Sequence, residues 1–265
     1  MARPTPVAGL SADLPARDAA RVLTAARLLD VRHRGAALVR EPSADAVHDL
    51  RVALRRLRAA LQLFGAAHRW SDELRELMRP LGDCRDAQLR LEWLRAASET
   101  AGVLVELEQR RLEVELPAAV ARVSSWLQSR ASSYQAAAAG LAPRGRFGGH
   151  RLRERLAALR RRVARREEAL DSDPAPRPAH RLRIAVKKLR YAAELLLHAD
   201  PGAVRRLLGE LADLQAILGD LHDADVRIEW LSAAHAAPPA ERRRLLARAQ
   251  AERVQLARKL LRQLD

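Results

Sequence analysis

Two blocks of sequence occur twice in this chain, in the same order. Residues 47–58 (VHDLRVALRRLR) align with residues 179–190 (AHRLRIAVKKLR), 132 positions later. Residues 81–94 (LGDCRDAQLRLEWL) align with residues 218–231 (LGDLHDADVRIEWL), 137 positions later. Two separate blocks in one order indicate an internal duplication, so the chain must fold as two similar halves.

The local pattern predicts that both halves are helical. Apolar residues recur at spacings of three and four almost throughout, and Ala, Leu, Arg and Glu, which favour helices, dominate the composition. About four helices fit into each half. We therefore predict an all-α fold of two four-helix bundles, related by the duplication and a pseudo-two-fold axis. In the first half, the expected helices span residues 16–40, 43–66, 72–98 and 103–139.

Proline- and glycine-rich stretches suggest the domain limits. The longest such stretch, residues 136–149, divides the chain almost in half. We expect a single domain over residues 16–265, built from a first helical half (16–140), a linker (141–149) and a second helical half (150–265). Residues 1–15 contain scattered Pro and Gly and are expected to form a flexible N-terminus.

Several classes of protein are excluded by what the sequence lacks. It has no apolar run of the roughly 18 residues that a membrane span requires and no secretory signal, so we expect a cytoplasmic protein without a membrane partner. Its single cysteine, Cys84, excludes a disulfide framework and reads as a buried apolar residue. No Gly-rich phosphate loop, nucleophile elbow or catalytic triad is recognisable, so we expect no enzymatic activity.

Metal and cofactor sites are also unexpected. None of the eight histidines lies three or four residues from another, and no Glu-x-x-His motif occurs, so the usual metal signature of helical bundles is missing. We predict neither a metal nor a cofactor.

Charge suggests the class of ligand. The chain has 48 Lys and Arg against 33 Asp and Glu, a formal net charge of +15, which attracts polyanions. Residues 143–190 contain 16 basic and five acidic residues, so the excess is concentrated. Only three of the basic residues are lysines, a bias that composition alone can produce. The positions of the cations therefore matter more than their number.

The first repeated block places its cations in one column. On a helix with 3.6 residues per turn, His48, Arg51, Arg55 and Arg58 fall on a narrow stripe beside the apolar face, and Arg56 lies off it. The second block repeats the stripe with His180, Arg183, Lys187 and Arg190, with Lys188 off it. Cations three and four residues apart repel each other, so either water or a bound anion must compensate the column. Its occurrence in two copies favours a surface that binds a phosphate chain.

These residues resemble a known family. The pattern H-x-x-R-x-x-x-[RK]-[RK]-x-R, followed by L-G-D-x-x-D-A, is similar in both copies to the CHAD family, the conserved histidine α-helical domain, over roughly residues 16–265. The resemblance implies two four-helix bundles with pseudo-two-fold symmetry. It also implies non-enzymatic binding of inorganic polyphosphate along a basic central groove, and we expect association with polyphosphate granules.

The resemblance also carries the site residues over to this chain. The implied polyphosphate contacts are His48, Arg51, Arg55, Arg56, Arg58, His180, Arg183, Lys187, Lys188 and Arg190. One position departs from a strict repeat, because His222 of the second copy aligns with Arg85 of the first. These two residues are secondary candidates.

Other interpretations of the same residues stay open. A nucleic-acid-binding module or a basic scaffold for an acidic protein could use the same surface, although single-strand binders usually offer aromatic side chains for stacking and the column has none. The pairs Asp86–Arg90 and Asp223–Arg227 are expected to form salt bridges within their helices. Trp93 and Trp230 are expected to anchor the core.

Overall fold

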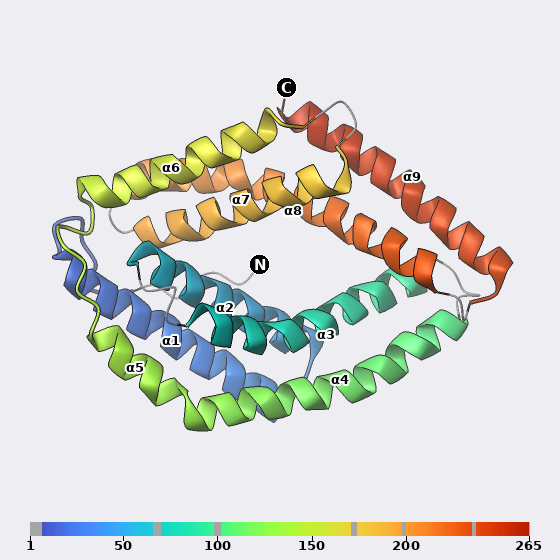
Figure 1. The fold of residues 1–265 in the computed structure, drawn as a ribbon, viewed down its shortest axis with the longest axis horizontal. Coiled ribbons are helices and arrows are strands. Elements are labelled where there is room, and N and C mark those ends of the chain that lie inside the picture. Colours follow the sequence, from blue (N-terminus) through green and yellow to red (C-terminus); the bar gives the residue numbers. More distant parts are fainter. Residues whose placement is uncertain are drawn as a thin grey trace. The chain divides into compact units, whose positions relative to one another are not determined.

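The structure is a computed structural model that describes residues 7–65, 70–97, 102–170, 174–197, 200–234 and 237–264. Over these ranges the chain forms nine α-helices and no strand, which confirms the predicted all-α fold class (Figure 1). The helices are α1 (Ala16–Arg40), α2 (Ala44–Leu63), α3 (Ser71–Ala97), α4 (Gly102–Ser129), α5 (Ala131–Ala139), α6 (His150–Glu167), α7 (Pro176–Leu196), α8 (Pro201–Ala233) and α9 (Pro239–Leu264). None of the described helices is both long and apolar enough to cross a membrane.

Several helices begin at residues that favour a helix start. The side chain of Ser43 accepts a hydrogen bond of 3.1 Å from the backbone N–H of Ala46 and thereby caps α2. Helices α7, α8 and α9 begin at Pro176, Pro201 and Pro239. Proline suits the first helical position because its ring presets φ and its missing N–H would have no partner there.

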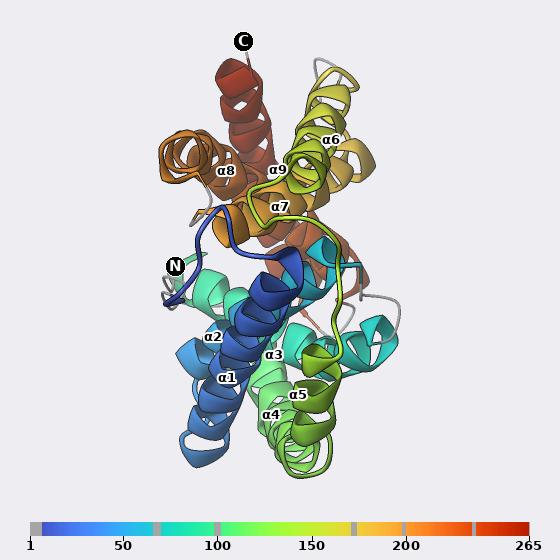
Figure 2. The same cartoon turned by 90° about the vertical axis from the view of Figure 1, so that its left-hand side faces the viewer.

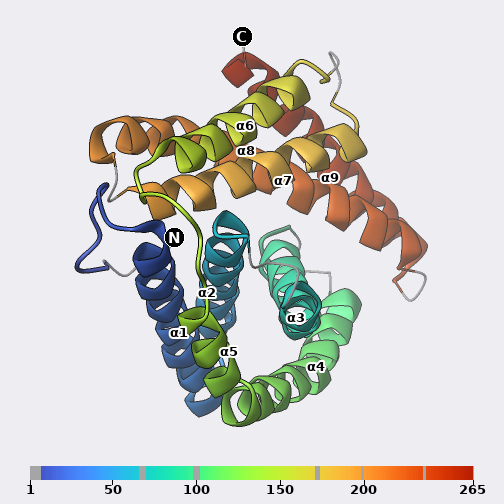
Figure 3. The ribbon, with the colours of Figure 1, turned by 60° about the vertical axis from the view of Figure 1, so that its left-hand side comes forward.

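The predicted single helix over residues 103–139 is wrong. Helix α4 ends at Ser129, and α5 begins at Ala131 and packs against α1 (Figures 2 and 3). Between them, Arg130 donates hydrogen bonds of 3.0 and 2.9 Å to the two carboxylate oxygens of Glu73 on α3. Serines also cluster around the break, and the hydroxyls of Ser129 and Ser133 donate to the backbone carbonyls of Ser125 and Arg130, so local bonds and the contact with Glu73 both favour a break here.

The predicted flexible N-terminus, residues 1–15, also needs correction. Residues 1–6 lie outside the described residues, but residues 7–15 are held by backbone hydrogen bonds to the segment before α6. For example, the N–H of Phe147 donates to the carbonyl of Leu14 at 2.8 Å, and the Phe147 side chain is fully buried. Backbone pairing of this kind leaves no periodic signal in the sequence.

The described contacts divide the chain into two compact units. Unit 1 comprises Met1–Gln88, Arg111–Leu156 and Tyr191–Arg205, and unit 2 comprises Leu89–Arg110, Ala157–Arg190 and Arg206–Asp265. Each unit takes segments from both halves of the sequence repeat, because the divisions fall inside long helices. The pseudo-two-fold relation between the halves stays a prediction.

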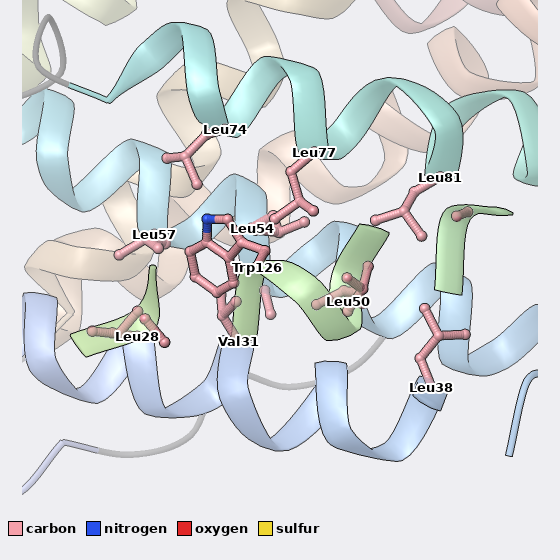
Figure 4. Packing of buried hydrophobic residues seen from close by; sticks show 14 of the residues in the cluster. Leu28, Val31, Leu38, Leu50, Leu54, Leu57, Leu74, Leu77, Leu81 and Trp126 are labelled. Carbon is pink, nitrogen blue, oxygen red and sulfur yellow. The ribbon is translucent and has the colours of Figure 1, made fainter. Parts of the chain in front are cut away.

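Unit 1 has a leucine-rich core formed by α1 to α5 (Figure 4). Helix α1 contributes Leu28, Val31 and Leu38, and Trp126 enters from α4. Cys84 is fully buried in the same cluster, as predicted, and burial raises the pKa of its thiol to about 11. The thiol is therefore protonated at neutral pH.

A buried cluster of unit 2 has a reciprocal contact at its margin. The guanidinium carbon of Arg90 lies 5.4 Å from the ring centroid of Trp230, and that of Arg227 lies 5.1 Å from the ring centroid of Trp93. Each arginine thus contacts the tryptophan of the other sequence copy, within cation–π distance. Both tryptophans are partly buried against the core, so they anchor its edge instead of its centre.

The same arginines form ion pairs with carboxylates of other helices. Arg90 pairs with Glu108 of α4 at 2.8 Å, and Arg227 pairs with Glu252 of α9 at 2.8 Å. Each of these ion pairs reaches the following helix. Arg227 also donates a hydrogen bond of 3.1 Å to the backbone carbonyl of Asp223, and the expected salt bridges within one helix stay predictions. Sequence spacing on one helix could not reveal partners on another.

Candidate functional site

The first column lies on the flank of α2. The apolar face of this helix is buried in the core of unit 1, through Val47, Leu50, Leu54, Leu57 and Leu61. The column residues are each half-buried: His48, Arg51, Arg55 and Arg58. Periodicity therefore predicted both faces of α2 correctly.

In two arginines of this column, the buried Nε atom has no hydrogen-bond partner that the structure describes. The Nε atoms of Arg55 and Arg58 are buried and have no hydrogen-bond partner among the described residues. These residues also form no ion pair within the described part of the chain. Two partly desolvated guanidinium groups one turn apart are costly without a counter-charge, and a bound anion would supply one.

Arg51 extends from α2 across the surface of α3. A Cβ atom at Gly82 would lie only 2.8 Å from its Nη1 atom, so the missing side chain of Gly82 makes room for the guanidinium. The aligned Gly219 has nothing within 4 Å of such a Cβ. The repeated glycine thus accommodates an arginine in the first copy only.

His48 lies in a positive environment. Burial, followed by the charges of Arg85 and Arg55, lowers the pKa of His48 from its ordinary value of 6.5. The secondary candidate Arg85 is therefore close enough to act on the first histidine of the column. The imidazole is mainly neutral at pH 7 and can still donate one hydrogen bond to an anion.

The second column lies on the flank of α7. The buried apolar residues of this helix include Leu182, Val186 and Leu189. The column residues are again half-buried: His180, Arg183, Lys187 and Arg190. Arg190 donates a hydrogen bond of 2.9 Å to the side-chain oxygen of Gln215 on α8, which fixes the last member of the column.

The secondary candidate His222 lies directly beside His180. Their Nδ1 atoms are 3.3 Å apart and their ring centroids 4.8 Å apart. Burial, then the charge of Arg183, lowers the pKa of His222 to about 3, and burial and Arg183 also lower the pKa of His180. At neutral pH one ring can therefore donate its Nδ1–H to the other.

Arg56 lies off the column of its own helix, α2. It is 6% exposed, and its Nε donates to a carboxylate oxygen of Glu194 at 2.8 Å, forming an ion pair inside unit 1. Such a residue cannot reach a ligand in solvent without breaking the pair, so its implied role as a contact is not supported. The aligned Lys188 is exposed on α7.

A pocket of about 640 Å³ opens beside the histidine pair in unit 2. It is formed by α7, α8 and α9. Its lining is Pro176, Arg177, His180, Arg181, His222, Asp225, Val226, Ile228, Glu229, Gln250 and Arg253. Sequence reasoning missed all of these except the two histidines. The α9 residues belong to neither repeated block, Arg177 and Arg181 lie off the column, and the other α8 residues lie inside a repeated block but carry no signal of the helices that they face.

The described residues contain no group of three or more His, Cys, Asp or Glu side chains arranged to hold a metal ion. His68, His198 and His235 lie outside the described residues. The expectation of a metal-free protein stays a prediction.

Comparisons with known proteins agree with the fold. The family model described as CHAD domain matches residues 21–232. The structure is similar to the crystal structure of the CHAD domain from the plant Ricinus communis, with a TM-score of 0.76, 24% identity, and coverage of 100% of this chain and 96% of that chain. It is also similar to PptA from Streptomyces chartreusis, with a TM-score of 0.67, 21% identity, and coverage of 94% and 99%. Among curated proteins, none matches the chain.

Proposed function

The chain belongs to the CHAD domain family, whose model matches residues 21–232. We therefore propose that it binds inorganic polyphosphate without chemically altering it. The family resemblance supports polyphosphate as the ligand. The proposed contacts are the eight column residues: His48, Arg51, Arg55, Arg58, His180, Arg183, Lys187 and Arg190. Arg85 and His222 would support the two histidines.

One observation carries the proposal. Arg55 and Arg58 present partly desolvated guanidinium groups without partners among the described residues, and α7 repeats the column in the same phase. Polyphosphate offers negatively charged oxygens at short, regular intervals along a flexible chain. Charge-assisted hydrogen bonds from arginine forks and a lysine ammonium match these oxygens.

The test is a charge reversal in both columns. In a titration with long-chain polyphosphate, the Arg55→Glu, Lys187→Glu double variant should lose saturable binding while its circular dichroism spectrum stays helical. The matched control is Arg32→Glu, Arg243→Glu, which changes the net charge equally at two exposed positions on α1 and α9. Equal loss in both double variants would show that only total charge matters, and unchanged binding in the first would overturn the proposal.

Salt and competition distinguish the proposed ligand from nucleic acid. Binding should weaken steeply with salt, because counterions released from the polyanion drive association. RNA or DNA at equal phosphate concentration should not displace polyphosphate, since the columns contain no Trp, Tyr or Phe side chain on which successive bases could stack. Displacement by either nucleic acid would favour the alternative of a nucleic-acid-binding module.

Acid should strengthen binding. The pKa values of His48 and His180 are lowered in the free protein, so both side chains are mainly neutral at pH 7. A bound polyanion favours the protonated forms and raises these pKa values. Affinity for polyphosphate should therefore increase as the pH falls towards about 6 and below. A flat pH profile would remove the histidines from the site.

Two parts of the proposal need separate measurements. Absence of catalysis predicts that polyphosphate incubated with the protein keeps its chain length on a gel and releases no phosphate. Cytoplasmic association with polyphosphate granules predicts that a fluorescent fusion gathers on granules. The fusion carrying Arg55→Glu and Lys187→Glu should stay dispersed.

A further inference from the structure

The pocket beside His180 and His222 has a wall that a phosphate chain cannot use. Pro176, Val226 and Ile228 line it with apolar surface. Its volume of about 640 Å³ lies within the range of small-molecule sites, roughly 300–1,000 Å³. Inorganic polyphosphate is polar along its whole length and would gain nothing from this wall, so the lining suits a ligand that also has an apolar part.

The rim of the pocket carries cations that are not neutralised. Arg177 and Arg181 are exposed one turn apart on α7 and form no ion pair with any described residue. The third arginine, Arg253, is bound to Asp225 at 2.7 Å. The carboxylate of Glu229 is the remaining acidic group of the lining. The rim therefore has an excess of positive charge, placed on one helix.

The first sequence copy does not share these cations. Arg177 and Arg181 align with Asp45 and Asp49, and Asp49 accepts a hydrogen bond of 2.8 Å from Arg34. The two copies thus keep the same column but carry opposite charges at the neighbouring positions. Arg177 and Arg181 are accordingly not part of the duplicated polyphosphate-binding pattern, and a different ligand would explain them.

We propose that this pocket binds a nucleoside phosphate. The phosphates would contact Arg177 and Arg181, which can form charge-assisted hydrogen bonds with them. The base would lie against Val226 and Ile228, where the imidazole ring of His180 offers a flat face. Glu229 and the side-chain oxygen of Gln250 can accept hydrogen bonds from ribose hydroxyls or an exocyclic amine, groups that inorganic polyphosphate lacks.

Calorimetric titration with ATP tests the proposal, with inorganic triphosphate as the comparison ligand. ATP should bind at one site per chain and at least about tenfold more tightly than triphosphate, because only ATP can use the apolar wall. The Arg177→Asp, Arg181→Asp variant should weaken ATP binding by about tenfold or more, the loss expected for charge-assisted hydrogen bonds. The matched control is Arg205→Asp, Arg206→Asp, which makes the same charge change at exposed positions of α8 outside the pocket.

Two results would overturn the proposal: ATP binding no tighter than triphosphate, or equal losses in the two double variants. This proposal does not depend on polyphosphate binding. The Arg55→Glu variant distinguishes ATP binding from polyphosphate binding. Arg55 does not line the pocket, so this variant should weaken binding of long-chain polyphosphate while leaving ATP affinity unchanged. Wild-type protein that binds ATP but not polyphosphate would reject the proposed function and leave the pocket assignment intact.

Discussion

In the first sequence copy, the charge of Arg85 acts on His48, whereas in the second copy His180 lies 3.3 Å from His222. Other aligned positions differ in the same way. Arg56 is buried against Glu194, while Lys188 is exposed, and Gly82 faces the Arg51 guanidinium, while the space beside Gly219 is open. The duplication thus kept the positions of the cations in the columns and let their surroundings diverge. Four experiments would test this comparison.

The largest difference between the two copies is expected in the stability lost when Arg56 or Lys188 is replaced by alanine. Arg56→Ala leaves the buried carboxylate of Glu194 without its partner and should lower the free energy of unfolding by about 3–5 kcal/mol. Lys188→Ala changes an exposed side chain and should cost about 1 kcal/mol or less. Urea denaturation followed by circular dichroism measures both. Most of the stability should return in the Arg56→Met, Glu194→Leu double variant. Similar losses of stability in the two alanine variants would show that the copies do not differ at this position.

Single charge reversals compare the two columns as binding surfaces. Arg55→Glu should weaken binding of long-chain polyphosphate more than Lys187→Glu, because a guanidinium can form a forked pair with phosphate oxygens whereas a lysine ammonium acts as a point charge, and the buried Nε of Arg55 has no partner among the described residues. We expect each to cost about tenfold or more in affinity, and each should reduce the dependence of affinity on salt. Titrations at several salt concentrations give both quantities. A larger loss for Lys187→Glu would reverse the ranking of the columns.

The histidine pair should make the second copy sensitive to acid. The pKa of His222 is about 3 in the folded protein, below the ordinary value of 6.5 expected on unfolding. The unfolded chain therefore binds more protons between these pH values, so stability is complete above pH 6.5 and declines as the pH falls below it. Thermal unfolding from pH 7 to 5 should show a shallower decline for His222→Gln than for wild type. The control, exposed His33→Gln, should follow the wild type, and parallel curves for all three proteins would contradict the assignment.

The smallest changes in affinity and stability are expected from substitutions at the aligned glycines, Gly82 and Gly219. Gly82→Ala should displace the flexible end of Arg51 and reduce polyphosphate affinity a few-fold, with little change in stability. Gly219→Ala meets open space and should raise the stability of α8 by up to about 1 kcal/mol, because alanine favours the helix, and should leave binding unchanged. Paired binding and unfolding measurements on the two variants test this. Equal effects on affinity would show that Arg51 does not depend on Gly82.

The sequence predicted the elements that follow from local rules. The all-α class, the first helix and the buried face of α2 agree with the structure, because apolar spacing and capping residues act within a few turns of one helix. The break at Arg130 and the ordered residues 7–15 did not follow from these rules. Both involve partners far along the chain: Glu73, which contacts Arg130 at the break, and the segment around Phe147, which pairs with residues 7–15.

For the candidate site, the sequence by itself determined which cations lie in a column on each helix, because a period of 3.6 residues fixes which side chains share a face. Only the tertiary structure decided what surrounds them. It buried Arg56 against Glu194, brought His222 to His180, and joined α9 to α7 and α8 around a pocket. Burial and pairing depend on which distant segments meet, and these contacts decide whether a cation stabilises the fold or is available to bind a ligand.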